Sequence, residues 1–160
     1  MSRIIELGHA SQPGRDRHEG SSESSNMFAS LRAMVLESVG PIRHEVSVPF
    51  HDSQVRGVAI LIQTGWDQRW GSEAYWEPPP FLAEHLIFRC IRAGVRVVGV
   101  DFPVGDRSEA TRLITTGKLP VVENLHGLAG LPRIGIRFNA IPLEPHSSSP
   151  IVVRAFAEIT

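Results

Sequence analysis

The chain has 160 residues, of which 42% are hydrophobic, and a net charge of −1. This length suits one domain, residues 1–160, with a buried core. Near-neutrality without a basic block argues against a nucleic-acid-binding surface. No apolar run approaches the roughly 20 residues of a membrane-spanning helix, and no signal-peptide core follows the N-terminus. A single cysteine, Cys90, excludes an internal disulfide. We therefore expect a cytoplasmic protein without nucleic-acid or membrane partners.

The first third of the chain predicts a strand, a loop, a helix and a second strand. A short strand is expected at residues 3–7. Residues 8–26 contain almost nothing to bury, so they predict a mobile loop that cannot offset its ordering entropy. Apolar residues at helical spacing predict a helix over 27–39. Alternating polar and apolar residues predict a half-buried strand over 42–48.

The middle of the chain combines a buried strand, an aromatic loop and a helix. Residues 57–64 predict a central strand, and residues 64–71 form a loop rich in aromatic residues and glycine. A helix is expected over 81–93, with Cys90 on its apolar stripe and Gly94 as its end. Four aromatic residues could wall a ligand pocket, pack against a partner subunit or cover the core; they are Trp66, Trp70, Tyr75 and Trp76.

Two β-branched runs, residues 95–100 and 119–122, each end on a carboxylate, Asp101 and Glu123. Such runs are typical of strands buried on both faces. A helical pattern over 107–117 connects them, which predicts a βαβ unit with both acids at the edge where ligands of open α/β sheets gather. The alternative is that the two acids cap loops or pair with arginines. Two final strands are expected at 134–143 and 151–159, which gives an α/β fold with a mixed sheet.

Several phrases of the chain resemble one known family. They are Ile-Ile-Glu-Leu-Gly-His (4–9), Val-Ala-Ile-Leu-Ile-Gln-Thr-Gly-Trp-Asp (58–67), Ala-Gly-Val-Arg-Val-Val-Gly-Val-Asp (93–101), Gly-Lys-Leu-Pro-Val-Val-Glu-Asn-Leu (117–125) and Arg-Phe-Asn-Ala-Ile-Pro-Leu (137–143). In this order they resemble the cyclases that include the bacterial kynurenine formamidases. The resemblance implies a swivelling β/β/α fold and a dimer or tetramer. It also implies a Zn or Mn centre that hydrolyses a small amide or ester, such as N-formylkynurenine, or serves ring closure.

The residues of that metal centre are missing from the sequence. The family signature His-x-Gly-Thr-His-x-Asp-x-Pro-x-x-His occurs nowhere, and Thr111 stands twelve positions before Glu123, where the family has a further histidine. Asp52 and four of the seven histidines fall at no familiar metal spacing; these histidines are His9, His18, His44 and His51. We therefore predict no metal and no other cofactor. No Gly-x-Ser-x-Gly elbow occurs, and Cys90 is expected in the core rather than as a nucleophile.

The strand-end pattern and the resemblance together select the candidate site residues. For catalysis we select Glu123, Asp101 and His126; for substrate binding, Trp66, Asp67, Trp70 and Thr111; for metal, none. The alternative for His126 is a solvent-facing turn residue.

Three functions follow as hypotheses. The first is a pocket for a small carbonyl-bearing metabolite, in which orientation alone promotes a metal-independent ring closure or proton transfer. The second is a non-catalytic paralogue that acts through oligomerisation or partner binding. The third is a metal-dependent amide hydrolase with a rebuilt metal site. In each case we expect a homo-oligomer, because loss of the metal-site residues would leave apolar faces to be buried.

Overall fold

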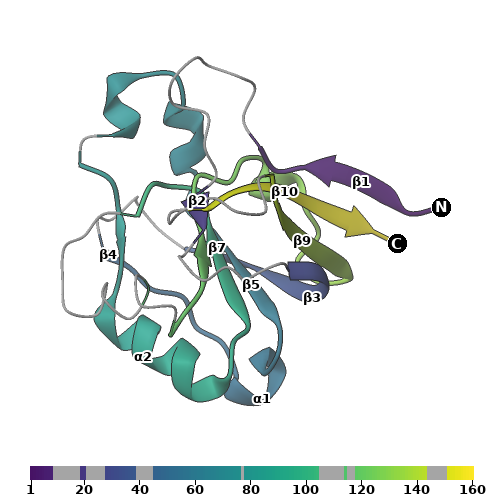
Figure 1. Ribbon diagram of the computed structural model, residues 1–160. Helices are drawn as coiled ribbons and strands as arrows, with labels where there is room; N and C mark the ends of the chain where they lie inside the picture. The colour runs from purple at the N-terminus through teal and green to yellow at the C-terminus, as the bar shows by residue number, and fades with distance from the viewer. Residues whose placement is uncertain are drawn as a thin grey trace.

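A curved mixed sheet lies at the centre of the structure, a computed structural model that describes residues 1–8, 19–20, 28–38, 45–76, 78–104, 114, 118–143 and 151–160. Its described strands pair in the order β1-β10-β2-β8-β7-β5-β3-β9. They are Arg3–Glu6 (β1), Glu19–Gly20 (β2), Phe28–Glu37 (β3), Ala59–Gln63 (β5), Val97–Val100 (β7), Val121–Val122 (β8), Ile136–Pro142 (β9) and Ile151–Ile159 (β10). Because β9 also pairs with β10, the strands from β10 through β2 to β9 close into a ring (Figure 1).

Four neighbouring strands of this ring, β3, β5, β7 and β8, run parallel. Their carboxyl ends therefore meet at one edge of the sheet, which we call the carboxyl edge. The short helices Trp66–Arg69 (η1) and Glu73–Tyr75 (η2) follow β5, and Leu128–Gly130 (η3) follows β8. In Figure 1, η1 and η2 lie at the opposite end of the molecule from Asp52–Val55 (α1).

Two hydrophobic cores lie on the two faces of the parallel strands. In β5, Ile60 and Ile62 point toward the helix Glu84–Ala93 (α2), whereas Ala59 and Leu61 lie in the core inside the ring. This alternation explains why the strand is apolar throughout, since every side chain is buried on one face or the other. All four residues are fully buried, with 0% of their surface exposed.

Most of the expected elements are confirmed. The strands predicted at 3–7, 57–64, 95–100, 119–122, 134–143 and 151–159 correspond to β1, β5, β7, β8, β9 and β10. The strand predicted over 42–48 is Glu45–Val46 (β4) in its described part. The predicted helix 81–93 begins only at Glu84, because Phe81–Leu82 (β6) pairs with β4 in a separate two-stranded sheet. It ends at Gly94, whose φ of 78° suits glycine.

The predicted helix over 27–39 is wrong, because its described part is the strand β3. Its sequence, Phe-Ala-Ser-Leu-Arg-Ala-Met-Val-Leu-Glu, is rich in helix formers. In the ring, however, Ala33 and Val35 enter the inner core while Met34 and Leu36 pack against the outer one. A strand that is buried on both faces does not need alternating polar and apolar residues. The apolar residues of β3 therefore match the spacing of a helix by coincidence.

Two predictions fall largely outside the described residues. Of the loop expected over 8–26, the structure describes Gly8 and the strand β2, which pairs with both β8 and β10. Of the helix expected over 107–117, it describes only Ile114, which is buried. Within the described ranges, no helix is long and apolar enough to span a membrane.

Candidate functional site

Three acidic side chains gather at the carboxyl edge. Asp101 directly follows β7, Glu123 directly follows β8, and Asp67 lies in η1, just after β5. The parallel pairing of β5 with β7, and of β7 with β8, brings these strand ends together. The expected placement of Asp101 and Glu123 at one edge, next to the loop that carries Trp66, is therefore what the structure has.

Asp101 is fully buried and holds the turn that follows β5. Its Oδ2 accepts hydrogen bonds from the backbone N–H groups of Thr64 (2.8 Å) and Gly65 (2.9 Å), and its Oδ1 accepts one from Thr64 Oγ1 (2.5 Å). Burial raises the pKa of Asp101 to about 6; the hydrogen bonds from Thr64 and Gly65 lower it, and Asp67 adds a smaller upward effect. Gly65 has a φ of 86°, the left-handed conformation that the turn needs.

These contacts give Asp101 the geometry of a positioning residue. Both of its oxygens are occupied by the neighbouring turn, and 0% of the residue is exposed. This arrangement matches the loop-capping alternative. The catalytic role selected for Asp101 stays a prediction.

Asp67 and His126 form a second pair at the same edge. Asp67 Oδ2 accepts a hydrogen bond from the backbone N–H of Gly127 (3.0 Å) and lies 3.5 Å from His126 Nδ1. The Asp67 side chain is 13% exposed and that of His126 is 51% exposed. The backbone N–H of His126 donates to the carbonyl of Leu7 (2.8 Å), which fixes the segment. The pair thus joins a sheltered carboxylate to an accessible imidazole.

Tyr75 and Asn124 connect the aromatic loop with Glu123. The Tyr75 hydroxyl donates a hydrogen bond to Asn124 Oδ1 (2.7 Å), and both residues are buried. Asn124 Nδ2 lies 3.5 Å from Glu123 Oε1, while Glu123 Oε2 accepts from the backbone N–H of Val104 (2.9 Å). Glu123 itself is half-buried.

The surroundings of Tyr75 keep its hydroxyl neutral. Burial raises its pKa well above the ordinary value, and the negative charges of Asp101, Glu123 and Asp67 add to the shift. Tyr75 therefore senses all three acids of the carboxyl edge, and it offers a hydrogen-bond donor rather than a negative charge.

Sequence reasoning missed the roles of Tyr75 and Asn124. The aromatic ring of Tyr75 places it in one group with the tryptophans, although it is the chain's only tyrosine. Asn124 enters the sequence argument only as part of the family phrase over residues 117–125. Its φ of 61° is one of two positive values among the described non-glycine residues, and asparagine directly after a strand-ending acid is the signal that could have indicated it.

The aromatic residues form one packed cluster. Trp66 is buried, and its indole N–H donates to the Tyr75 carbonyl (2.8 Å). The ring of Tyr75 lies 5.0 Å, centroid to centroid, from both Trp70 and Trp76, in edge-to-face contacts. For Trp66 this supports the core-covering alternative. Ligand contacts by Trp66, Asp67 and Trp70 stay predictions, and Thr111 lies outside the described residues.

The described residues do not fit the metal centre that the resemblance implies. Both oxygens of Asp101 accept hydrogen bonds from the turn that follows β5, and Glu123 accepts one from Val104, so neither side chain presents a full carboxylate to a cation. Among the described residues, no group of three or more His, Cys, Asp or Glu side chains converges as metal ligands would. The absence of a metal cofactor stays a prediction.

Comparison with known proteins supports the fold. Residues 37–107 match the family model described as "Putative cyclase". Isatin hydrolase A from Labrenzia aggregata is 15% identical with a TM-score of 0.77, over 99% of this chain and 94% of that one. The enzyme of the same name from Ralstonia solanacearum is 14% identical with a TM-score of 0.71, over 99% and 92%.

A third structure, titled a potential metal-dependent hydrolase with cyclase activity, is 11% identical with a TM-score of 0.68 over 100% of both chains. No curated protein sequence matches significantly. At these identities the structural likeness shows the fold alone. The chain is thus a mixed α/β protein with the fold of cyclase-like hydrolases, and its central part is similar in sequence to the cyclase family.

Proposed function

We propose that this chain is a cyclase-like protein that binds a small carbonyl-bearing metabolite at the carboxyl edge and transfers a proton to or from it without a metal. The observation that carries the proposal is the contact between Asp67 and the accessible imidazole of His126. Imidazole is a common general acid and base in enzymes, and an adjacent carboxylate orients its ring.

The surrounding residues have supporting roles in this proposal. Asp101 fixes the turn that carries Asp67, through its three hydrogen bonds from Thr64 and Gly65. Tyr75 stays protonated and holds Asn124, which in turn lies beside Glu123. His126 takes or returns the proton. Glu123 is the second carboxylate that we assign to ligand binding, and we retain Trp70 and Thr111 as ligand contacts.

The reaction that we favour is the opening of a cyclic amide by water, in which the ring C–N bond breaks as a C–O bond forms, or the reverse ring closure with loss of water. The structural relatives named above include isatin hydrolases, and isatin contains a carbonyl group within a small amide ring. We therefore choose isatin as the first probe, with N-formylkynurenine as the open-chain alternative. Each probe is incubated with the purified full chain in buffer that contains a chelator. The ring-closed and ring-opened compounds are then separated by chromatography and quantified.

The test compares the variants H126Q and D67N with H85Q. His85 lies on α2 and bonds to Ser47, so it provides a matched control away from the carboxyl edge. We expect turnover in wild type and H85Q, with a loss of about 100-fold in H126Q, in the range ascribed to general acid–base catalysis. Equal turnover in H126Q would contradict the proton-transfer role. Turnover that the chelator abolishes would support the rebuilt metal site instead.

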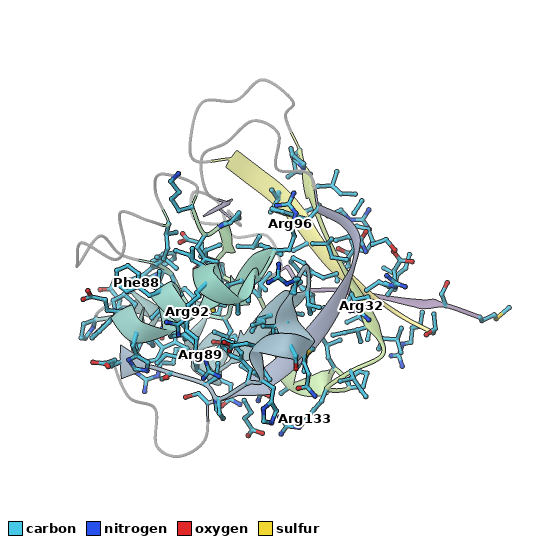
Figure 2. All side chains as sticks on the ribbon, turned by 90° about the horizontal axis from the view of Figure 1, so that it is seen from below. Arg32, Phe88, Arg89, Arg92, Arg96 and Arg133 are labelled. Carbon is cyan, nitrogen blue, oxygen red and sulfur yellow. The ribbon has the colours of Figure 1, made fainter. Side chains whose placement is uncertain are left out.

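A non-catalytic paralogue is the second candidate, and two observations favour it. The chain's own donors already contact both oxygens of Asp101 and both oxygens of Glu123. In addition, Phe88 on α2 is 50% exposed and labelled in Figure 2, which offers an apolar contact for a second copy. Light scattering of wild type and F88Q tests this self-association. A homo-oligomer that F88Q weakens, combined with no turnover of either probe, would favour this candidate.

A further inference from the structure

Two arginines face each other directly across neighbouring strands at the end of the sheet opposite the carboxyl edge. In the antiparallel pairing of β3 with β9, Arg32 is the register partner of Arg137. Directly opposed side chains start about 5 Å apart at Cβ, and like charges in such positions are destabilising. Both residues are exposed. A repulsive pair at this position suggests that the structure gains something else from holding the two cations together.

The guanidinium of Arg137 is held in place by the backbone. Its Nη1 donates to the carbonyl of Ser30 (3.2 Å), a residue with a φ of 53° next to an irregularity in the β3–β9 pairing. The buried side chain of Asn139 supports this unusual conformation, since its Oδ1 accepts from the Ser30 N–H (2.8 Å). Asn139 Nδ2 also donates to Glu158 (2.9 Å), which lies opposite Arg137 on β10. The nearest acid by register is thus already bonded to an amide.

A surface cavity of about 400 Å³ opens beside these two arginines. Its described lining combines the two cations with the polar residues Gln54 and Thr160 and an apolar wall, and none of the described lining residues has an acidic side chain. The lining includes Arg32, Arg137, Gln54, Met34, Val58 and Ile134. Ile134 is 68% exposed, so a large apolar side chain stands open to solvent at this cavity. A cavity of this volume is large enough for a small organic molecule.

The surrounding charge also favours an anion. Figure 2 views the molecule from this end and labels Arg92 on α2, Arg96 in the segment before β7 and Arg32 on β3. The acid Asp52, in α1, already forms an ion pair with Arg89. The acids of the candidate site lie at the opposite end of the parallel strands. The sheet therefore separates an acidic edge from an arginine-rich one.

We propose that the cavity beside Arg32 and Arg137 is a second binding site, for a small carboxylate with an apolar body. Guanidinium groups bind carboxylates through paired, charge-assisted hydrogen bonds. Such a ligand would relieve the repulsion between the two arginines, and its apolar body would cover Met34, Val58 and Ile134. The site is independent of the proton-transfer pair at the carboxyl edge.

In the experiment, sodium benzoate is titrated into the full chain at constant ionic strength. Binding is followed by the NMR chemical shifts of the labelled methionine methyl groups and of the backbone amides. Met34 and Gly135 line the cavity and report binding directly. The variants are R32Q and R137Q. R92Q is the matched control, because this substitution removes the same charge from an exposed residue of α2 that does not line the cavity.

We expect saturable shifts at Met34 and Gly135 in wild type and R92Q, with affinity at least about tenfold lower in R32Q and R137Q, as loss of a charge-assisted hydrogen bond predicts. No saturable shift in the wild type would overturn the proposal, whatever the variants do. An equal loss of affinity in R92Q would mean that benzoate responds to the overall positive charge of this surface and not to the two arginines of the cavity. Sulfate binding as tightly as benzoate would overturn the role of the apolar wall.

Discussion

The hydroxyl of Tyr75 donates a 2.7 Å hydrogen bond to Oδ1 of Asn124, a residue 49 positions later in the chain. This bond joins η2 to the segment that follows β8, and so it ties the aromatic cluster to the end of the strand that presents Glu123. Because Asn124 has a positive φ, the bond also stabilises a backbone conformation that few side chains adopt. The geometry of the candidate site thus depends on a contact between a side chain of the loop and one of the strand end.

The ionisation of Tyr75 should be suppressed as long as the protein is folded. Burial and the nearby acids Asp101, Glu123 and Asp67 raise its pKa well above the ordinary value of about 10. Since Tyr75 is the only tyrosine, the tyrosinate absorbance of the whole protein reports this residue. We expect no tyrosinate absorbance until the protein unfolds at alkaline pH. The absorbance and the circular dichroism should then change in one transition. A gradual titration near pH 10 with unchanged circular dichroism would refute the buried hydroxyl.

The variant Y75F should lower the free energy of unfolding by about 1–3 kcal/mol, because it leaves the buried Oδ1 of Asn124 without this donor. Denaturant unfolding of wild type and variant measures the difference. Ser72 provides a control: its exposed hydroxyl donates to the carbonyl of Arg69 (2.7 Å), and S72A exposes that carbonyl to water. We expect a much smaller effect of S72A. If both variants lost the same free energy of unfolding, the buried hydrogen bond of Tyr75 would contribute no more to stability than the exposed one of Ser72.

Burial of Asp101 should make stability depend on acidity. Its folded pKa, about 6, lies above its ordinary value of 3.8, so the folded state holds this proton more tightly than the unfolded chain does. The resulting stabilisation is full below about pH 4 and is lost as the pH rises through about 6. The shift of about two units corresponds to roughly 3 kcal/mol.

The variant D101N should abolish this contribution, because asparagine does not titrate. Unfolding free energies measured between pH 4 and pH 7 should therefore fall more steeply with pH in the wild type than in D101N. E73Q, which alters an exposed acid of η2, should keep the wild-type slope. The same slope in all three proteins would show that Asp101 titrates as it does in the unfolded chain.

Local sequence patterns predicted the parallel strands well, because β5, β7 and β8 consist of short β-branched or apolar runs that end on polar residues. They failed for β3, whose helix-forming residues adopt a strand only because cores lie on both of its faces. They also failed for β2. Its two residues, Glu19 and Gly20, have no strand pattern and are placed by pairing with β8 and β10.

The same limit applies to the candidate site. Asp101 and Glu123 could be predicted because each directly follows its own strand. The contacts of Tyr75 with Asn124, and of Asp67 with His126, join residues 49 and 59 positions apart. No local pattern encodes such pairs, because they depend on how the loops after β5 and β8 pack together. For the same reason, the opposition of Arg32 and Arg137 became visible only with the register of β3 and β9.

The close approach of Gly99 to the inner core gives a final prediction. Gly99 lies in β7 and faces the inside of the ring. A Cβ at this position would come within 2.6 Å of Leu125 Cδ1 and 2.7 Å of Leu61 Cδ2. Both leucines are fully buried in the inner core, so any shift of their side chains must be taken up by the packed residues around them. We expect G99A to lower the free energy of unfolding by about 1–3 kcal/mol, as overpacking of a filled core does.

Gly130 offers the matched control for this substitution. It lies in η3, and a Cβ there would meet no atom within 4 Å. G130A should therefore change the stability by no more than about 0.5 kcal/mol, which is usual for a surface substitution. Chemical denaturation of the three proteins under one set of conditions measures both effects. A G99A protein as stable as wild type would mean that Leu61 and Leu125 can repack, and that the ring encloses more space than the contacts around Gly99 indicate.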